Sequence, residues 1–443
     1  MLKNDGARRF DAWLIISLAI FSVVLALGAF DVIYGYISLF FYCLFVVLKA
    51  TKRGFYGLIT HYSAVGIYAT LATAFQISEG FEFWGFGSIQ DGYYYVALVL
   101  VCLFCYSYEV GYHISGADKM HFGRVKIFRL DIDNNRDLKF ISAALIFFGI
   151  ALVLIYIRPD LSIELRGYQT NDEGRAVSVF FFAYLPKLFI WALCAIAGIL
   201  LLATRSKRYG SLFVFAAIAA LIWAGPQTTA RQVILVGALP LLYYAATLTY
   251  PIILPIVIWV GVLFVGPALN YFSRDYLYGV ETQGFPFSPD FDAMYIVSAL
   301  IERIDYFPLG LGRYLLSAFS FFLPRELKLF VEFDPLNREG GAVFSQTNVS
   351  TPPFFTAFLD FWFLGPVLLG IAIGAFIGWA EIFRQRKYAA GNLWFLIPFV
   401  VFSSYVPFIR GPILGWGPYI LAGVSSYGLL IWAFYFFSQD RRR

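Results

Sequence analysis

Two isolated arginines lie in short turns between apolar segments, in positions where chemistry is a natural explanation. Arg231 follows Thr228-Thr229-Ala230 and opens an apolar helix, so its charge lies where the helix dipole favours an anion. Arg410 lies in the last short turn, within Phe408-Ile-Arg-Gly-Pro412. Because a guanidinium can donate two parallel hydrogen bonds, both arginines suit a phosphorylated ligand. The alternative for each is an anchor whose charge extends to the lipid headgroups.

The side chains that could act as a general acid or base near these arginines are carboxylates, and all of them lie in one polar segment. The chain has three histidines, and the orientation argued below places them on the opposite side: His61, His113 and His121. We expect Asp275 and Asp292 to be the leading general-base candidates. The alternatives are an ion pair with Arg274 for Asp275, and stabilisation of a helix N-terminus for Asp292. Asp290-Phe291-Asp292 alone is too weak a pattern for a metal site, so we expect no metal and no cofactor.

Further basic residues could bind an anionic substrate. They are Arg166, Lys187, Arg274, Arg313 and Arg325. Lys187 follows Pro186 and lies about 12–14 Å into an apolar run by helical rise. An ionisable side chain at that depth is a functional candidate, although a lysine can also extend to the membrane interface.

These residues are set in a chain whose composition predicts a membrane protein. Of its 443 residues, 60% are hydrophobic and 14% are charged, a balance that a soluble domain cannot bury. The sequence predicts an all-α polytopic membrane protein, with residues 1–443 forming one integral membrane domain. Apolar runs of about 17–25 residues predict about twelve spans, near 12–30, 32–48, 57–76, 93–112, 140–157, 178–203, 210–224, 232–249, 251–267, 354–381, 393–408 and 417–437.

Lysines and arginines orient these spans. Most of the 33 cations fall into clusters that alternate spans place on one side, at 3–9, 49–53, 119–139, 205–208, 384–387 and 441–443. Because loops rich in Lys and Arg stay in the cytoplasm, both termini are predicted to be cytoplasmic. The net charge of +5 therefore follows membrane topology, and we expect no nucleic-acid partner.

The longest polar interruption, residues 267–353, is predicted to be a large, partly helical extracytoplasmic loop. Ser288-Pro289 reads as the start of a helix. Met294, Val297, Ile301 and Ile304 continue it at helical spacing. We expect an amphipathic helix on the membrane surface or on the bundle. The apolar residues 315–323 are too few to span a bilayer, and we expect them to dip into the interface and close a lipid-accessible cavity.

Short motifs from residue 160 onward resemble those of one bacterial family in the same order. They are Leu165-Arg166-Gly167-Tyr168, Pro186, Thr229-Ala230-Arg231, Arg274-Asp275, Ser288-Pro289, Phe322-Leu-Pro-Arg325, Ser350-Thr-Pro352 and Ile409-Arg410-Gly411. The chain resembles the Wzy-type polymerases of O-antigen and enterobacterial common antigen. The motifs cover roughly residues 160–437; the first four spans add only hydropathy, and the resemblance assigns no role to Lys187.

This resemblance implies a metal-independent membrane glycosyltransferase of the GT-C class in the bacterial inner membrane. Its substrates would be oligosaccharide repeat units linked to undecaprenyl diphosphate, and a chain-length regulator protein would be a partner. Arg231 and Arg410 would stabilise the departing diphosphate, which would be the main catalytic contribution.

Two other functions remain open, besides a structural membrane protein with no active site, which would leave Arg231 and Arg410 unexplained. One is an O-antigen ligase, a related activity whose large loop typically carries a histidine; this loop has none. The other is a polysaccharide flippase or transporter, which typically has charges along central helices and internal repeats. In this chain the spans hold few charges and one outer loop is long.

Overall fold

The computed structural model describes ten stretches of the chain: residues 4–83, 87–119, 134–157, 184–225, 231–248, 252–265, 284–287, 291–318, 351–411 and 413–438. Within them every regular element is a helix, as the hydropathy predicts. The chain divides into two compact units. Unit 1 contains Met1–Phe122, Pro255–Ile382 and Tyr405–Trp416, and unit 2 contains Gly123–Leu254, Phe383–Ser404 and Gly417–Arg443. Each unit is considered by itself.

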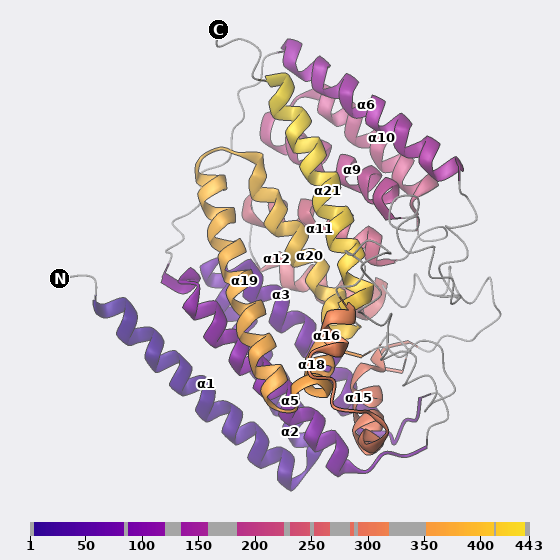
Figure 1. The fold of residues 1–443 in the computed structure, drawn as a ribbon. Coiled ribbons are helices and arrows are strands. Elements are labelled where there is room, and N and C mark those ends of the chain that lie inside the picture. Colours follow the sequence, from indigo (N-terminus) through magenta and orange to yellow (C-terminus); the bar gives the residue numbers. More distant parts are fainter. Residues whose placement is uncertain are drawn as a thin grey trace. The chain divides into compact units, whose positions relative to one another are not determined.

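Unit 1 is built on long helices near the N-terminus (Figure 1). They are α1 (Asn4–Phe30), α2 (Val32–Arg53), a continuous helix of α3 (Tyr56–Ala64), η1 (Val65–Leu71) and α4 (Ala72–Ser78), and α5 (Asp91–Ile114). The Asp31 carboxylate accepts a 2.8 Å hydrogen bond from the Ile33 N–H and begins α2. Gly54, with φ 68°, ends it in the left-handed conformation that glycine adopts easily.

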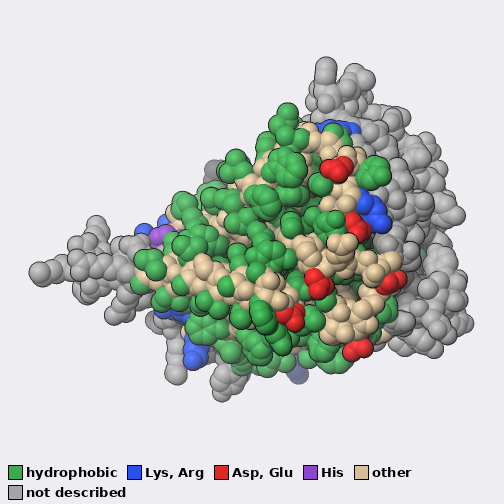
Figure 2. Space-filling model, turned by 90° about the horizontal axis from the view of Figure 1, so that it is seen from below, with side chains coloured by type: hydrophobic (Ala, Val, Ile, Leu, Met, Phe, Trp, Pro, Cys, Tyr) green, Lys and Arg blue, Asp and Glu red, His purple; other side chains and the backbone are tan. Residues whose placement is uncertain are grey.

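Opposite charges mark the two ends of these helices. Helices α2 and α5 run in the same direction, because Tyr36 of α2 bonds to Tyr94 early in α5, and Tyr42 bonds to Glu109 late in α5. The acidic end therefore carries Asp31, Glu79, Glu82 and Asp91, and the basic end carries Lys49, Lys52, Arg53 and Lys119. Figure 2 looks onto the acidic end, where acidic side chains gather at one edge of a hydrophobic surface. This asymmetry favours the predicted orientation.

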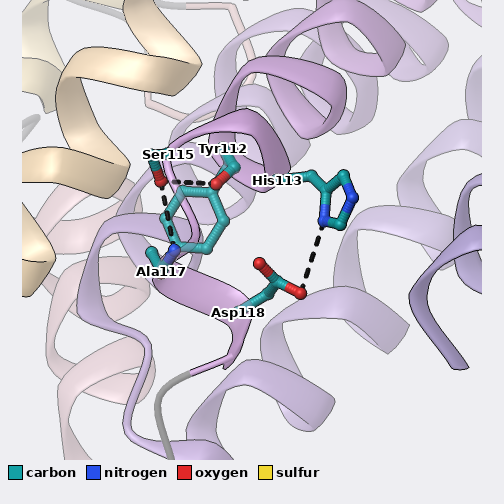
Figure 3. Close-up of polar contacts among 5 residues, drawn as sticks. All are labelled: Tyr112, His113, Ser115, Ala117 and Asp118. Atoms are coloured by element: carbon teal, nitrogen blue, oxygen red, sulfur yellow. Dashed lines mark hydrogen bonds and ion pairs between the residues drawn. The ribbon is translucent and has the colours of Figure 1, made fainter. Parts of the chain in front are cut away.

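A short polar turn closes α5 at the basic end. The Ser115 hydroxyl donates to the Tyr112 carbonyl at 2.6 Å and accepts from the Ala117 N–H at 3.2 Å. Beyond it, His113 Nδ1 lies 3.4 Å from an Asp118 carboxylate oxygen (Figure 3). Burial raises the pKa of Asp118, and the neighbouring His113 opposes this rise. The turn brings η2 (Ala117–Lys119) back against the end of α5.

A seam of glycines joins α19 (Leu364–Ala389) to α5. Gly370, Gly374 and Gly378 recur every four residues on α19. A Cβ atom added at Gly374 would lie 2.1 Å from the Tyr108 carbonyl oxygen, and one at Gly370 would lie 2.7 Å from that of Phe104. Such small-residue repeats let two helix backbones approach closely within a membrane.

Unit 2 has a similar reliance on small residues. Its helices are α6 (Asn134–Ile157), α9 (Leu185–Thr204), α10 (Lys207–Trp223), α11 (Arg231–Leu248) and most of α21 (Ile413–Ser438). Gly237 of α11 lies against Trp191 of α9, where a Cβ would be 2.3 Å from the tryptophan Cβ. The Gly237 carbonyl also accepts a 2.6 Å hydrogen bond from the Tyr427 hydroxyl. Buried Tyr209 of α10 donates to buried Asp137 of α6 at 2.7 Å.

Within the described residues, nine helices are long and apolar enough to cross a membrane. Eight of them match expected spans, and the ninth, within α19, overlaps only the later part of the expected span 354–381. The expected spans at 210–224, 232–249 and 251–267 coincide with shorter helices: α10, α11, and α12 (Ile253–Val260) followed by η4 (Gly261–Val265). Their status as spans stays a prediction. The tenth expected span, 354–381, is corrected below.

Candidate functional site

The expected loop, 267–353, is described at residues 284–287, 291–318 and 351–353, and the described parts lie on unit 1. The buried side-chain amide of Gln76, on α4, donates hydrogen bonds to the Pro286 carbonyl at 2.8 Å and the Phe291 carbonyl at 3.0 Å. The Tyr295 hydroxyl donates to the Gly87 carbonyl at 2.9 Å. These contacts fix the first part of the polar segment to the acidic end of the helices.

The helix expected in this segment is present, but it is buried on all sides and does not have one exposed polar face. It is α15 (Ala293–Glu302), and all of its residues from Ala293 to Ile301 are buried. It packs on α5 and η1, so it lies on the bundle and not on the membrane surface. Residues 288–290, including the expected Ser288-Pro289 start and Asp290, lie outside the described part. Few polar residues lie in this buried helix. One of them, Ser298, donates its hydroxyl hydrogen to the Met294 carbonyl of the same helix.

The tenth expected span is interrupted. Residues Pro353–Phe361 form the short helix α18, and α19 begins afresh at Leu364. Trp362, between them, has φ 50°, a conformation that residues other than glycine rarely adopt. A Cβ atom at Gly365 would lie 1.9 Å from the Ala357 carbonyl oxygen, so α19 folds back closely along α18. Hydropathy alone could not reveal this corner, because the residues on both sides of it are apolar.

Helix α18 begins at the middle of α5, not at its end. Phe354, at its start, contacts Phe104 with ring centroids 5.7 Å apart. Phe104 is 13 residues into α5, about 20 Å along the axis by helical rise. The chain therefore reaches Thr351-Pro352, which are not helical, at the depth of a span. Non-helical backbone at that depth is tolerated where it is buried in protein or lines a cavity.

A buried carboxylate on α18 holds the last described part of the polar segment. The two Asp360 oxygens accept hydrogen bonds from the N–H groups of Tyr314 at 3.0 Å and Leu315 at 2.8 Å. These groups belong to the first turn of α16 (Arg313–Ala318), whose N–H groups have no partner within the helix. Burial raises the pKa of Asp360, and the Leu315 and Tyr314 N–H groups and the Arg313 charge oppose this rise.

Arg313 is the one predicted substrate-binding residue that the structure places beside this carboxylate. Its guanidinium carbon lies 5.5 Å from the centre of the Tyr314 ring, and its charge acts on Asp360. Gly310, just before it, is so close that an added Cβ would lie 2.0 Å from an Asp360 oxygen. An arginine and a carboxylate therefore meet beside the corner of α18 and α19.

Arg410 ends α20 (Leu396–Arg410) and is half-buried. Five residues earlier on the same helix, the Tyr405 hydroxyl lies 2.8 Å from His61 Nδ1, and its ring lies against Tyr108 of α5. Arg410 thus belongs to unit 1 at a depth comparable with the start of α18. Its expected partner, Arg231, belongs to unit 2 and its side chain is outside the described part. The convergence of the two arginines stays a prediction.

The remaining predicted site residues fall into two groups. Asp292 is buried at the N-cap of α15, and its side chain makes no capping hydrogen bond there. Lys187 is buried in the first turn of α9, directly after Pro186; its expected depth stays a prediction because residues 178–183 are not described. Four others lie outside the described residues: Arg166, Arg274, Asp275 and Arg325.

Sequence reasoning missed Asp360 and a second buried acid, Glu109 of α5. The signal was visible in each case, since a single carboxylate stands within an apolar run. Within the described residues no group of three or more His, Cys, Asp or Glu side chains could hold a metal ion. A scan of known protein families and searches of curated proteins and solved structures find no match to this chain.

Proposed function

We propose that this protein is a Wzy-type polymerase with a GT-C-like architecture in the bacterial inner membrane. It transfers a growing glycan from undecaprenyl diphosphate to the terminal sugar of another lipid-linked repeat unit. The proposal rests on the ordered motifs between residues 160 and 437 and on a multi-pass helical chain with nine helices of span length among its described residues.

The observation that carries the proposal furthest is the corner of α18 and α19. A polymerase for lipid-linked glycans needs polar groups at membrane depth, where a lipid diphosphate can enter sideways from the bilayer. Helix α18 and its two ends supply such groups, since the non-helical backbone before α18 lies near the middle of α5 and Asp360, close to the corner, lies beside Arg313. The aromatic residues exposed at the corner, Phe361, Trp362 and Phe363, suit contact with lipid or with sugar faces.

In the proposed reaction the acceptor hydroxyl attacks the anomeric carbon of the donor glycan, and the bond to the diphosphate breaks. Arg410 and Arg231 bind the departing diphosphate, whose charge grows as that bond breaks. Arg313 holds the same anion or the acceptor. A carboxylate takes the proton of the acceptor hydroxyl, with Asp292 and Asp275 as the candidates. Asp360 is less suited to this role, because both of its oxygens already accept backbone N–H groups.

The test is deletion of the gene followed by analysis of surface polysaccharide. A polymerase mutant keeps surface glycans with one repeat unit and loses the polymer, and a plasmid copy of the gene restores the polymer. A ligase mutant would retain polymer on the lipid carrier without transfer to the surface acceptor. A flippase mutant would accumulate single lipid-linked units inside the cell. Either of the last two patterns overturns the proposal.

A further inference from the structure

Unit 1 contains a carboxyl group, buried among its helices, that the proposed glycosyl transfer does not use. Glu109 of α5 is buried, and its Oε1 atom accepts hydrogen bonds from two tyrosines. The Tyr42 hydroxyl lies 2.5 Å from Oε1, and the Tyr62 hydroxyl is also hydrogen-bonded to it. Among the described residues, the buried Oε2 atom has no hydrogen-bond partner. The group therefore has one fully engaged oxygen and one open oxygen.

The positions of the hydrogens follow from the neighbours. The Tyr42 hydroxyl also lies 2.8 Å from the Ser17 hydroxyl of α1. A tyrosine hydroxyl has a single hydrogen; with that hydrogen donated to Glu109, as the shorter contact favours, Tyr42 accepts from Ser17. Oε1 then receives two O–H donors and acts as the acceptor oxygen. In this arrangement a proton bound by the carboxyl lies on Oε2, the atom that is open.

The surroundings of Glu109 hold little to balance a negative charge. The titratable and polar side chains around it come from four helices: Ser17 of α1, Tyr42, Cys43 and the more distant Lys49 of α2, Tyr62 of α3, and Cys105 of α5. On α19, Glu381 binds the Gly57 N–H at 3.1 Å. The Lys49 ammonium lies 3.1 Å from the centre of the Trp13 ring, toward the basic end. An ion in such an interior without a close counter-ion costs several kcal/mol, whereas a neutral carboxyl avoids this cost.

We propose that Glu109 is a proton-binding site inside the membrane domain, with the proton held on Oε2 between α1, α2, α3 and α5. The ligand is a proton and not a metal cation. The Tyr42 and Tyr62 hydroxyls donate their hydrogens to the carboxyl, so their oxygen lone pairs, which would bind a metal, point away from it. The core of unit 1 can therefore be neutral or negatively charged at Glu109, depending on whether this proton is bound. This site is independent of the proposed glycosyl transfer.

The test uses dicyclohexylcarbodiimide, which reacts with protonated carboxyl groups in apolar surroundings. The acid adds across the carbodiimide, its proton moves to nitrogen, and the acyl group migrates to give a stable N-acylurea without a leaving group. The full-length protein in native membranes is treated at several values of pH, and the modified peptide is identified by mass spectrometry. We expect Glu109 to be modified at low pH and progressively less as the pH rises. Glu109→Gln removes the modified peptide, whereas Glu381→Gln, at another buried carboxyl, leaves it.

Two further variants test the local chemistry. Tyr62→Phe removes a donor that favours the ionised carboxylate, and Lys49→Gln removes the cation that acts on Glu109, so both extend modification to higher pH. Lys49→Arg, which keeps the charge, should behave as the native protein. Infrared spectroscopy gives an independent measurement: the native spectrum minus that of Glu109→Gln should show the carbonyl band of a protonated carboxyl. Absence of that band overturns the proposal, as does protection by sodium ions at constant pH.

Discussion

The carboxylate of Asp360 accepts a 3.0 Å hydrogen bond from the backbone N–H of Tyr314, which lies 46 residues earlier in the chain. A second bond of 2.8 Å, from Leu315, occupies the other oxygen. The side chain of a short buried helix thus supplies the cap that α16 lacks in its own sequence. Because α16 has six residues, it has few hydrogen bonds of its own and depends on this partner.

Replacing Asp360 by alanine should loosen α16 and lower the stability of the protein. The change leaves two backbone N–H groups in a buried region without an acceptor, at a cost of about 1–3 kcal/mol each. Thermal unfolding of the purified full-length chain in detergent should show a clear fall in midpoint. Asp305→Ala, at an exposed carboxylate nine residues before Tyr314, is the control and should have little effect. Equal behaviour of the two variants would contradict a capping role for Asp360.

The stability contributed by Asp360 should depend on pH with a defined sign. Burial raises the pKa of Asp360, so the folded protein keeps the proton at pH values where the unfolded chain, with an aspartate pKa of about 3.9, releases it. The contribution is therefore fully present below the unfolded pKa and is lost as the pH rises through the folded pKa. Relative to Asp360→Asn, which does not titrate, the native midpoint should fall as the pH rises above about 4 and through the raised pKa of Asp360. A rising native midpoint would show that the N–H donors and Arg313 outweigh burial.

The glycine seam between α5 and α19 should not tolerate side chains. A Cβ atom at Gly374 would lie 2.1 Å from the Tyr108 carbonyl oxygen, which is backbone and cannot move aside without separating the helices. Gly374→Ala should therefore reduce the amount of folded protein and its unfolding midpoint. Gly149→Ala is matched to it, because Gly149 also lies in a predicted span and an added Cβ would meet nothing within 4 Å. We expect that control to keep or slightly raise stability, since alanine favours helix.

Arg410 and Arg231 should each be needed for polymer formation. A hydrogen bond to a charged group contributes about 1.5–3 kcal/mol, so Arg410→Ala or Arg231→Ala should lower polymerisation at least about tenfold at unchanged protein level. Lysine at either position should restore activity in part, because it keeps the charge but loses the planar fork. Arg303→Ala is the control: this arginine lies beside Glu302 at 3.4 Å and has no proposed contact with substrate. Full polymer in both alanine variants would contradict the proposed diphosphate site.

Membrane orientation can be checked with single cysteines at the two ends of unit 1. The four native cysteines are buried, so they add little background. Exposed Ser88, beside the acidic end, should react with an impermeant thiol reagent from outside when replaced by cysteine. Exposed Lys52, at the basic end, should be protected until the membrane is opened. The reverse pattern would place the polar segment and its arginines in the cytoplasm and would rule out the proposed function.

The membrane helices were the predictable part of this fold. Each of the first four expected spans lies within a helix of the structure, because nothing but a helix satisfies a long apolar run in lipid. The corner at Trp362 was not predictable, since apolar residues continue through it and the close fit of Gly365 on Ala357 is a tertiary contact. The acids Glu109 and Asp360 were visible as isolated charges, but their partners, Tyr42 and Tyr314, are far away in sequence.

The shortness of α18 has a consequence for how the protein is made. Its nine residues are about half the number that the insertion machinery recognises as a membrane span, and Asp360 makes it a still poorer candidate. The segment cannot enter the bilayer on its own during synthesis. We expect it to take its place after α5 and α19 have paired, because its contacts in the folded protein are with Phe104 of α5 and with α19 itself. Formation of the proposed site is then a late event, and a chain whose spans are all inserted is not yet completely folded.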